Sequence, residues 1–128
     1  MTKLEAIFDD LNKAALRLEE VLELEKTAIH RDSAIQRFEF CFDLAWKSIK
    51  VFLEEKKKVV CNSPTDCFRE AYRQGLIEYD EEWLKTADMR NKTSHTYNEE
   101  FAEEVYKKLP IVLKNFKQLL AALQAAGL

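Results

Sequence analysis

Arg90 and His95 lie in one short segment, RNKTSHTYNEE, which spans residues 90–100. A guanidinium grips phosphate oxygens through paired N–H groups and keeps its charge at any working pH. An imidazole takes up or releases a proton near neutral pH. Metal-free cleavage of RNA needs both functions: charge stabilisation at the phosphorus, and a proton taken from the 2′-hydroxyl or given to the leaving 5′-oxygen. The residue types in this segment therefore suit chemistry on a phosphodiester.

The spacing within this segment decides whether the two side chains can act together. On an unbroken helix, residues five apart diverge by about 140°, so Arg90 and His95 would point to different sides. The hydroxyl-bearing residues Thr93, Ser94 and Thr96 are poor helix formers, because their side chains compete for backbone hydrogen bonds. We therefore expect the helix to unwind here, which lets the guanidinium and the imidazole face one phosphate.

Other interpretations of these residues stay open at this point. Asn91 and His95 are four apart, so the amide can hold the imidazole in one tautomer. From spacing alone, Arg90 is most often a surface ion-pair partner, here with Glu99 or Glu100. His95 is most often a polar residue at a helix end. One histidine also supplies one proton-transfer group, so a second would have to come from a second copy of the segment in a symmetric dimer.

Length and composition indicate what kind of fold positions this segment. At 128 residues it is expected to form one domain over 1–128, with a single core. Only two glycines and two prolines leave little room for the tight turns of an all-β fold. A net charge of -3 argues against a generic nucleic-acid-coating protein, although it leaves room for a local basic pocket.

Cellular location is predicted from the amino terminus and the cysteines. The opening MTKLEAIFDD has acidic residues where a signal peptide would carry its apolar core. No apolar run approaches the roughly 20 residues that a membrane span requires. Cys41, Cys61 and Cys67 include no CxxC pair, which favours reduced thiols over a disulfide framework or a zinc site. We therefore expect a cytoplasmic protein that has no contact with a membrane.

Apolar residues three and four apart predict a chain built of helices. The first helix is expected over residues 3–25. The second is expected to start at Asp32 or Ser33, either of which can cap it, and to run to about Lys57. The last is expected to continue the apolar stripe from a cap at Asn98.

Two shorter helices are expected between them. The sequence SPTD predicts a third helix, with Ser63 as the cap and Pro64 at the first helical position. Gly75 is expected to end it in a left-handed conformation. The fourth is expected to open near Asp80 and to lead into the Arg90 segment. Pro110 lies inside the last helix and is expected to kink it, because proline removes a backbone donor.

The second helix is apolar on most of its sides, which suggests that it is central or buried against a second chain. Five apolar residues fall outside its core stripe: Phe40, Cys41, Leu44, Trp46 and Val51. The pattern predicts an all-α, up-and-down four-helix bundle of four to five helices, and a homodimer.

The chain resembles a known family over nearly its whole length. The stretches that carry the resemblance are RFEFCFDLAWKSIK, SPTDCFREAYRQGLI and DEEWLKTADMRNKTSHTYNEE. The last contains Arg-x4-His-x-Tyr, the signature of the HEPN toxins called HepT, which overlap the nucleotidyltransferase substrate-binding proteins. The polar Asn91 after the arginine conforms to the family's pattern.

The resemblance implies a HEPN-like bundle that dimerises with the motif lining a cleft between chains. It implies a metal-independent ribonuclease without a cofactor, in which Arg90 and His95 are catalytic and Asn91 supports them. It also implies a toxin–antitoxin pair, whose second member is a minimal nucleotidyltransferase that transfers AMP from ATP to Tyr97. A bulky anionic adenylate beside Arg90 would occupy the phosphate site and repel RNA.

Other basic residues and a second function remain as alternatives. Lys92 is a candidate for assisting phosphate binding and is equally well interpreted as a solvated charge. Three further side chains could extend a basic lining, although such helix-surface charges are more often only solvated: Arg69, Arg73 and Lys47. The alternative function is a non-catalytic nucleotide- or substrate-binding subunit of a two-component nucleotidyltransferase. The chain is not expected to be the transferase itself, since it has no Gly-Ser loop followed by paired metal-binding carboxylates.

Overall fold

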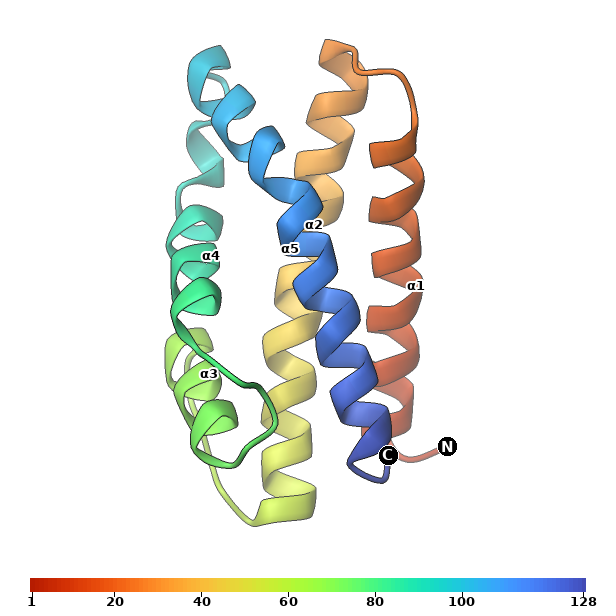
Figure 1. Cartoon of the computed structure of the whole chain (residues 1–128), viewed down its shortest axis with the longest axis vertical. Coiled ribbons are helices and arrows are strands. Elements are labelled where there is room, and N and C mark those ends of the chain that lie inside the picture. The colour runs from red at the N-terminus through yellow and green to blue at the C-terminus, as the bar shows by residue number, and fades with distance from the viewer.

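The computed structural model describes residues 1–128 and contains five α-helices and no strand, which confirms the predicted all-α helical bundle. Figure 1 shows α1 (Lys3–Glu23), α2 (Ala28–Phe52), α3 (Pro64–Arg73), α4 (Glu81–Asn91) and α5 (Glu99–Ala125). A π-helical turn, η1 (Leu53–Lys57), continues α2, and a 3₁₀ turn, η2 (Thr93–His95), follows α4.

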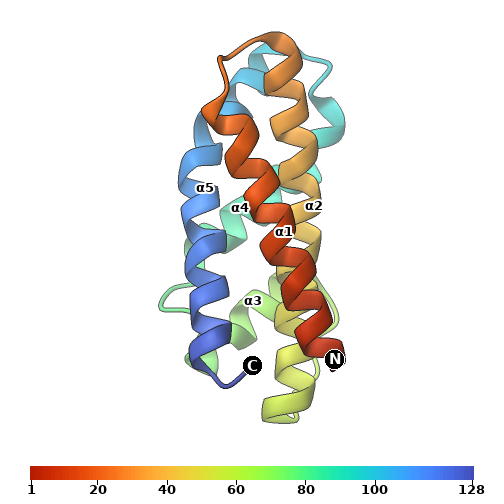
Figure 2. The ribbon, with the colours of Figure 1, turned by 90° about the vertical axis from the view of Figure 1, so that its right-hand side faces the viewer.

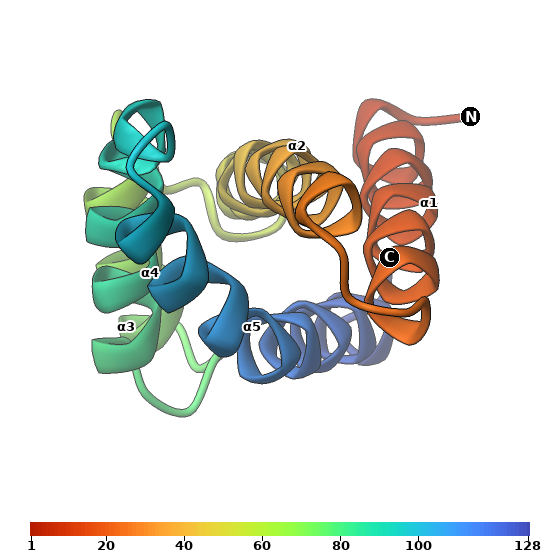
Figure 3. The same cartoon turned by 90° about the horizontal axis from the view of Figure 1, so that it is seen from above.

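Helix α2 is the central element of the bundle. It packs against each of the other four helices, and Figure 3 shows it between α1 on one side and the α3–α4 side on the other. This position explains why α2 is apolar on most of its sides. The segment between α4 and α5 lies at the same end of the bundle as the start of α2, whereas both chain termini lie toward the opposite end (Figure 2).

The start of α2 differs from the prediction of Asp32 or Ser33. Thr27 caps the helix instead, and its side-chain oxygen accepts a hydrogen bond from the backbone N–H of His30 at 3.0 Å. The Asp32 carboxylate accepts a hydrogen bond from Arg31 rather than capping the helix. The C-terminal limit was predicted well, because the helical course continues through η1 to Lys57.

The predicted ends of α3 are confirmed. The Ser63 hydroxyl accepts a hydrogen bond from the backbone N–H of Asp66, and Pro64 occupies the first helical position. Gly75 takes a left-handed conformation with φ of 76°. Its N–H donates to the carbonyl of Tyr72, which is half of the paired backbone bonding that ends many helices at a glycine.

An aromatic cluster fixes α4 in the bundle. Trp83 on α4 stacks on Phe68 of α3, with ring centroids 4.8 Å apart, and its other neighbour is Phe116 of α5 at 5.7 Å. Phe68 in turn contacts Phe42 of α2 at 5.7 Å. Such aromatic pairs contribute beyond the area that they bury. The helix that leads into the Arg90 segment is therefore held through Trp83 by aromatic contacts with α3 and α5.

Most of the apolar surplus on α2 is buried within the single chain. Cys41 and Val51 are buried, and Leu44 and Trp46 are half-buried against the core. Phe40 is the exception, with 48% of its surface exposed. The homodimer therefore stays a prediction, and it rests on a smaller apolar surface than the sequence suggested.

The expectation of three reduced thiols is wrong for two of the cysteines. Cys61 and Cys67 form a disulfide with their Cα atoms 5.1 Å apart. The bond joins the segment before α3 to the first turn of that helix, since α3 begins at Pro64 and brings Cys67 back beside Cys61. Cys41 is free and fully buried, and burial raises the pKa of its thiol to about 12.

Helix α5 begins at the predicted cap, because the side chain of Asn98 accepts a hydrogen bond from the backbone N–H of Phe101 at 3.1 Å. It continues through Pro110 as one helix, and its ribbon changes direction along its length (Figure 3). None of the five helices combines the length and hydrophobicity that crossing a bilayer would require.

Candidate functional site

The helix that carries Arg90 unwinds directly after it. Helix α4 ends at Asn91, and a series of short backbone turns replaces it. The N–H of His95 donates to the carbonyl of Lys92 at 3.0 Å, and the N–H of Asn98 donates to the carbonyl of His95 at 3.0 Å. We call residues 91–98 the motif turn. Its backbone is tightly hydrogen-bonded, so the turn has a defined shape rather than that of a loose loop.

The guanidinium of Arg90 is held by two carboxylates of α2. Its Nη1 donates to Glu39 Oε2 at 2.9 Å, and its Nη2 donates to Asp43 Oδ2 at 3.2 Å. The ion-pair interpretation of Arg90 is therefore right about the kind of contact but wrong about Glu99 and Glu100 as partners. Glu39 and Asp43 are one helical turn apart, which places both carboxylates on the side of α2 that faces α4.

Thr93 completes this contact from within the motif turn. Its side chain is buried, and its hydroxyl oxygen accepts a hydrogen bond from Arg90 Nη1 at 3.1 Å. The same hydroxyl lies 3.0 Å from Glu39 Oε2 and 2.8 Å from the carbonyl of Arg90, either of which can accept its one proton. Thr93, which was predicted to favour the end of the helix, therefore also connects the motif turn to Glu39 of α2.

One donor of Arg90 stays without a protein acceptor. Its Nε is buried and forms no hydrogen bond, while both Nη atoms are engaged. A buried donor without a partner is unfavourable, and a ligand oxygen reaches this one only if the Arg90 side chain moves. Because two carboxylates already offset the charge of Arg90, a phosphate here competes with Glu39 and Asp43 for the guanidinium.

His95 and Tyr97 are exposed on the outer side of the motif turn. Their rings meet edge to face, with centroids 6.1 Å apart and planes at 70°. Tyr97 is 83% exposed, so its side chain is accessible from solvent. Asn91 is also exposed and forms no hydrogen bond with His95, which contradicts the expectation that it fixes the imidazole tautomer. Since the helix ends before Tyr97, this residue is not stacked above Arg90 as an unbroken helix would place it.

The structure does not gather the other predicted basic residues around the motif turn. Lys92 pairs with Asp88 at 3.0 Å, and Arg73 pairs with Glu70. Arg69 is exposed and shares α3 with Arg73, and this helix lies toward the other end of the bundle from the motif turn (Figure 1). Lys47 is exposed on α2, one turn after Asp43, and forms no ion pair. Of these four residues, only Lys92 belongs to the motif turn.

Sequence reasoning missed Glu39, Asp43 and Thr93 as parts of this site. The available signal was the pair of acids four apart on the second helix, a spacing that places both on one face. A groove of 520 Å³ lies elsewhere, between the α3–α4 connection and α5, and is lined by residues such as Trp83 and Leu119. No residue of the motif turn lines it.

Comparisons with known proteins agree on the family. A family model described as nucleotidyltransferase substrate binding protein like matches residues 6–125. A Haemophilus influenzae protein named probable ribonuclease HepT is 38% identical over 95 residues, which cover 71% of this chain and 65% of that relative, just under two thirds of its length.

Two solved structures have the same fold. A crystal structure of a Thermus thermophilus protein is 36% identical with a TM-score of 0.84, and the match covers 88% of this chain and 98% of that one. A Haemophilus influenzae structure, described as the fold of a substrate binding domain of a nucleotidyltransferase, is 29% identical with a TM-score of 0.66. That match covers 94% of this chain and 96% of the other.

Proposed function

Because the chain belongs to the family of nucleotidyltransferase substrate-binding proteins that includes HepT, we propose that it is a metal-independent endoribonuclease. Arg90 and His95 are its catalytic pair. The observation that carries the proposal is the unwinding of α4 at Asn91, which puts an exposed imidazole in a rigid turn directly after an anchored guanidinium. A HepT relative named as a probable ribonuclease supports the same activity.

The chemistry is a transesterification within the RNA. The 2′-oxygen attacks the adjacent phosphorus, the bond from phosphorus to the 5′-oxygen breaks, and the products are a 2′,3′-cyclic phosphate and a free 5′-hydroxyl. His95 takes the proton of the 2′-hydroxyl or gives one to the leaving 5′-oxygen. Arg90, whose side chain is 28% exposed, stabilises the charge that develops on the non-bridging oxygens. Asn91, exposed beside them, supports binding of the substrate.

The two carboxylates that hold Arg90 serve this chemistry by fixing the guanidinium in place. A flexible arginine loses conformational freedom when it grips a phosphate, whereas one already bound to Glu39 and Asp43 has lost that freedom in advance. The carboxylates also weaken unspecific attraction to RNA. Together with the net charge of -3, this favours a substrate that fits the site over generic nucleic-acid binding.

Control of this activity is proposed to act through Tyr97. A cognate minimal nucleotidyltransferase, acting as the antitoxin, transfers AMP from ATP to the tyrosine hydroxyl and releases pyrophosphate. The exposed position of Tyr97 suits this reaction, and its contact with the His95 ring means that an adenylate would sit beside the catalytic imidazole. The added phosphate would repel the RNA backbone and cover His95.

A homodimer is proposed as the working form. The cytoplasm stays its proposed location, although the thiol argument for it no longer holds, because Cys61 and Cys67 are bonded. Phe40 is exposed on α2 and shares a helix face with Asp43, three residues further on. A second copy packed on Phe40 would therefore lie beside the Arg90 ion pair. Such a dimer brings two motif turns toward one cleft and supplies a second proton-transfer group.

The test is RNA cleavage in EDTA by purified protein, with the products analysed for a 2′,3′-cyclic phosphate. We expect cleavage by the wild type and its loss in His95→Ala. The matched control is His30→Ala, which removes the other histidine, whose Nδ1 lies 2.6 Å from the carbonyl of Glu25. Cleavage that persists in His95→Ala after a contaminant control removes this residue from the mechanism.

A second candidate is favoured by the description of the family itself. As a non-catalytic subunit, the chain would hold a nucleotide or substrate for a nucleotidyltransferase on another polypeptide, with Arg90 and His95 binding phosphate without turnover. The same EDTA assay separates the two functions. RNA bound but left intact by the wild type supports the binding subunit.

A further inference from the structure

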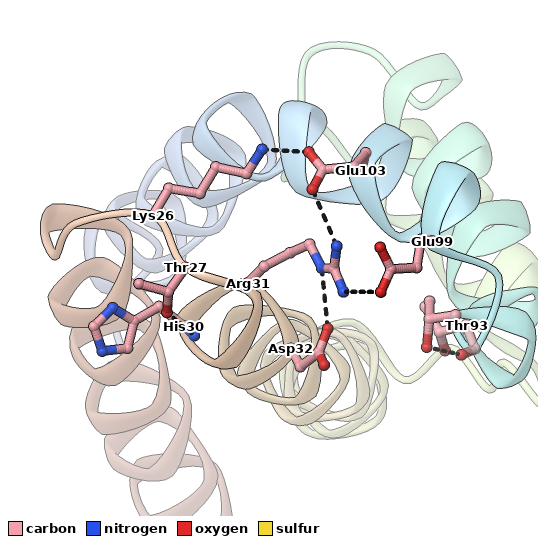
Figure 4. A network of polar contacts seen from close by, with 9 residues as sticks. Lys26, Thr27, His30, Arg31, Asp32, Thr93, Glu99 and Glu103 are labelled. Atoms are coloured by element: carbon pink, nitrogen blue, oxygen red, sulfur yellow. Dashed lines mark hydrogen bonds and ion pairs between the residues drawn. The ribbon is translucent and has the colours of Figure 1, made fainter.

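Arg31 is a buried cation surrounded by carboxylates at the start of α2 (Figure 4). Only 7% of its side chain is exposed. Its Nε donates to Asp32 Oδ1 at 3.0 Å and its Nη1 to Glu103 Oε1 at 3.1 Å, while its Nη2 lies 3.9 Å from Glu99 Oε1. Lys26 adds a second cation on Glu103.

Two of these carboxylates belong to the first turns of α5, directly after the motif turn. Glu99 and Glu103 are one helical turn apart, and Figure 4 shows both directed at Arg31. Asn98, which caps α5, donates its N–H to the carbonyl of His95. A shift of the first turn of α5 would therefore move Asn98, and with it the backbone of His95.

The opposite end of the motif turn is held by the same helix. Glu39 of α2 binds both Arg90 and Thr93. Arg31 and Glu39 are eight residues apart on α2, which corresponds to about 12 Å along a helix axis. The motif turn is thus fixed at both ends to α2, through Glu39 at its start and through Arg31 and the first turns of α5 at its end. Its middle, at Ser94 and His95, is exposed.

The chemistry of the Arg31 contact is suited to setting an orientation. An apolar side chain would hold α2 against α5 by packing, which fixes the distance between the two helices but leaves their relative orientation less restricted. Hydrogen bonds from a planar guanidinium constrain both, because each needs its acceptor at a set angle. Buried ion pairs are often no more stabilising than apolar contacts of the same volume. A contribution to stability therefore does not by itself explain a buried arginine at this position.

We propose that Arg31 is a positioning residue of the active site. By holding Glu99 and Glu103, it sets where His95 and Tyr97 stand relative to the anchored guanidinium of Arg90. This inference rests on the proposed function, because relative placement of the two side chains matters to a reaction that uses both.

The kinetic test uses Arg31→Gln and Arg31→Lys. We expect Arg31→Gln to lower kcat about tenfold per folded molecule with KM for RNA within about twofold, since substrate binding groups are retained while their alignment is lost. Arg31→Lys keeps the charge and is expected to recover part of kcat. The control is Lys117→Gln, which breaks the Lys117–Glu19 pair that links α5 to α1 and is expected to leave kcat unchanged.

A structural readout tests the same inference without relying on turnover. In NMR spectra, we expect the backbone amide resonances of residues 95–98 to keep their wild-type positions in Lys117→Gln and to shift in Arg31→Gln, because the turn that carries His95 then moves relative to Arg90. If Arg31→Gln fails to fold, Glu103→Gln, at a more exposed position of the same network, takes its place with the same expectation. Motif-turn resonances that stay at their wild-type positions in these variants overturn the inference. If the wild-type protein cuts no RNA, the ribonuclease proposal is wrong. The NMR result still tests the positioning role of Arg31 in that case, because it does not depend on turnover.

Discussion

Arg90 donates a hydrogen bond to Glu39 at 2.9 Å, which ties the last turn of α4 to the middle of α2 across 51 residues of sequence. The same carboxylate oxygen lies 3.0 Å from the hydroxyl of Thr93. One glutamate therefore fixes both the guanidinium and the turn that follows it. This relationship makes α2 part of the candidate site, although it carries no residue of the Arg-x4-His-x-Tyr motif.

Glu39→Ala tests whether this contact positions Arg90. Loss of a half-exposed ion pair is expected to lower the free energy of unfolding by about 1 kcal/mol. We expect kcat for RNA cleavage to fall about tenfold, or about 1.4 kcal/mol, because the guanidinium is no longer held. Denaturant unfolding and steady-state kinetics measure the two effects.

Glu100→Ala is the matched control for that variant. Glu100 is an exposed acid at the start of α5 that forms no ion pair, so its removal changes the nearby charge by the same amount without touching Arg90. Equal kinetic effects of Glu39→Ala and Glu100→Ala would mean that Glu39 acts through its charge alone.

Tyr97→Phe separates catalysis from its control. The phenylalanine ring retains the edge contact with His95 but lacks the hydroxyl that would receive the adenylate. We expect RNA cleavage within about twofold of the wild type, and no gain of mass when the variant is incubated with the cognate nucleotidyltransferase and ATP. Tyr79→Phe, which changes another exposed tyrosine, should still be modified. Modification of Tyr97→Phe would place the acceptor elsewhere.

Local signals in the sequence predicted the ends of the helices and the break in the motif. Ser63, Gly75 and Asn98 act through hydrogen bonds or backbone angles within a few residues, and all three do so in the structure. The start of α2 was placed too late because Thr27 and Asp32 are both residue types that favour a cap, and the sequence alone does not choose between them.

The partners of the charged residues were not predictable in the same way. The contacts of Arg90 with Glu39 and Asp43 join residues 51 and 47 apart, so they depend on how α4 lies against α2. The same dependence explains why Arg69 and Arg73 were grouped with the motif, although α3 carries them to another part of the bundle. Tertiary packing, rather than local propensity, decides these contacts.

The Glu103 carboxylate gives a prediction for the pH dependence of stability. Hydrogen bonds from Lys26, and then from Arg31, hold the pKa of Glu103 below its ordinary value of 4.5. A lowered carboxyl pKa stabilises the fold above pH 4.5, and this contribution is lost as the pH falls through the lowered value. We expect Glu103→Gln to have a lower Tm than the wild type at pH 7, and the difference to shrink below pH 4.5. A difference in Tm that is constant from pH 7 to pH 3 would contradict this origin.

The cysteines predict a specific pattern of thiol reactivity. Burial keeps the Cys41 thiol protonated, with a pKa of about 12, and Cys61 is bonded to Cys67. Native protein purified without reductant is therefore expected to react with no equivalent of a thiol reagent at pH 8, because the thiolate is the reactive form. Unfolding should expose one thiol, and unfolding after reduction should expose three. Three thiols in unreduced, unfolded protein would contradict the disulfide.

Phe40 predicts where a second copy of the chain binds. It is the large apolar residue that α2 leaves exposed near the Arg90 ion pair, so burying it against a partner would bring two motif turns close together. We expect light scattering to give twice the chain mass of 15.0 kDa for the wild type and the single mass for Phe40→Lys. Because Phe40 is already 48% exposed, this substitution should leave the fold of the single chain intact.

Tyr72→Lys is the control for the dimer, since Tyr72 is exposed to a similar extent, 46%, but lies on α3. This variant should remain dimeric and keep its activity, whereas Phe40→Lys should lose cleavage together with the dimer if two motif turns share the proton transfers. A Phe40→Lys variant that is monomeric and still cuts RNA at the wild-type rate would show that one chain is sufficient. In that case the second proton transfer must involve another residue of the same chain or a water molecule. Glu39, which is bonded to Arg90, would be the first residue to test for that role.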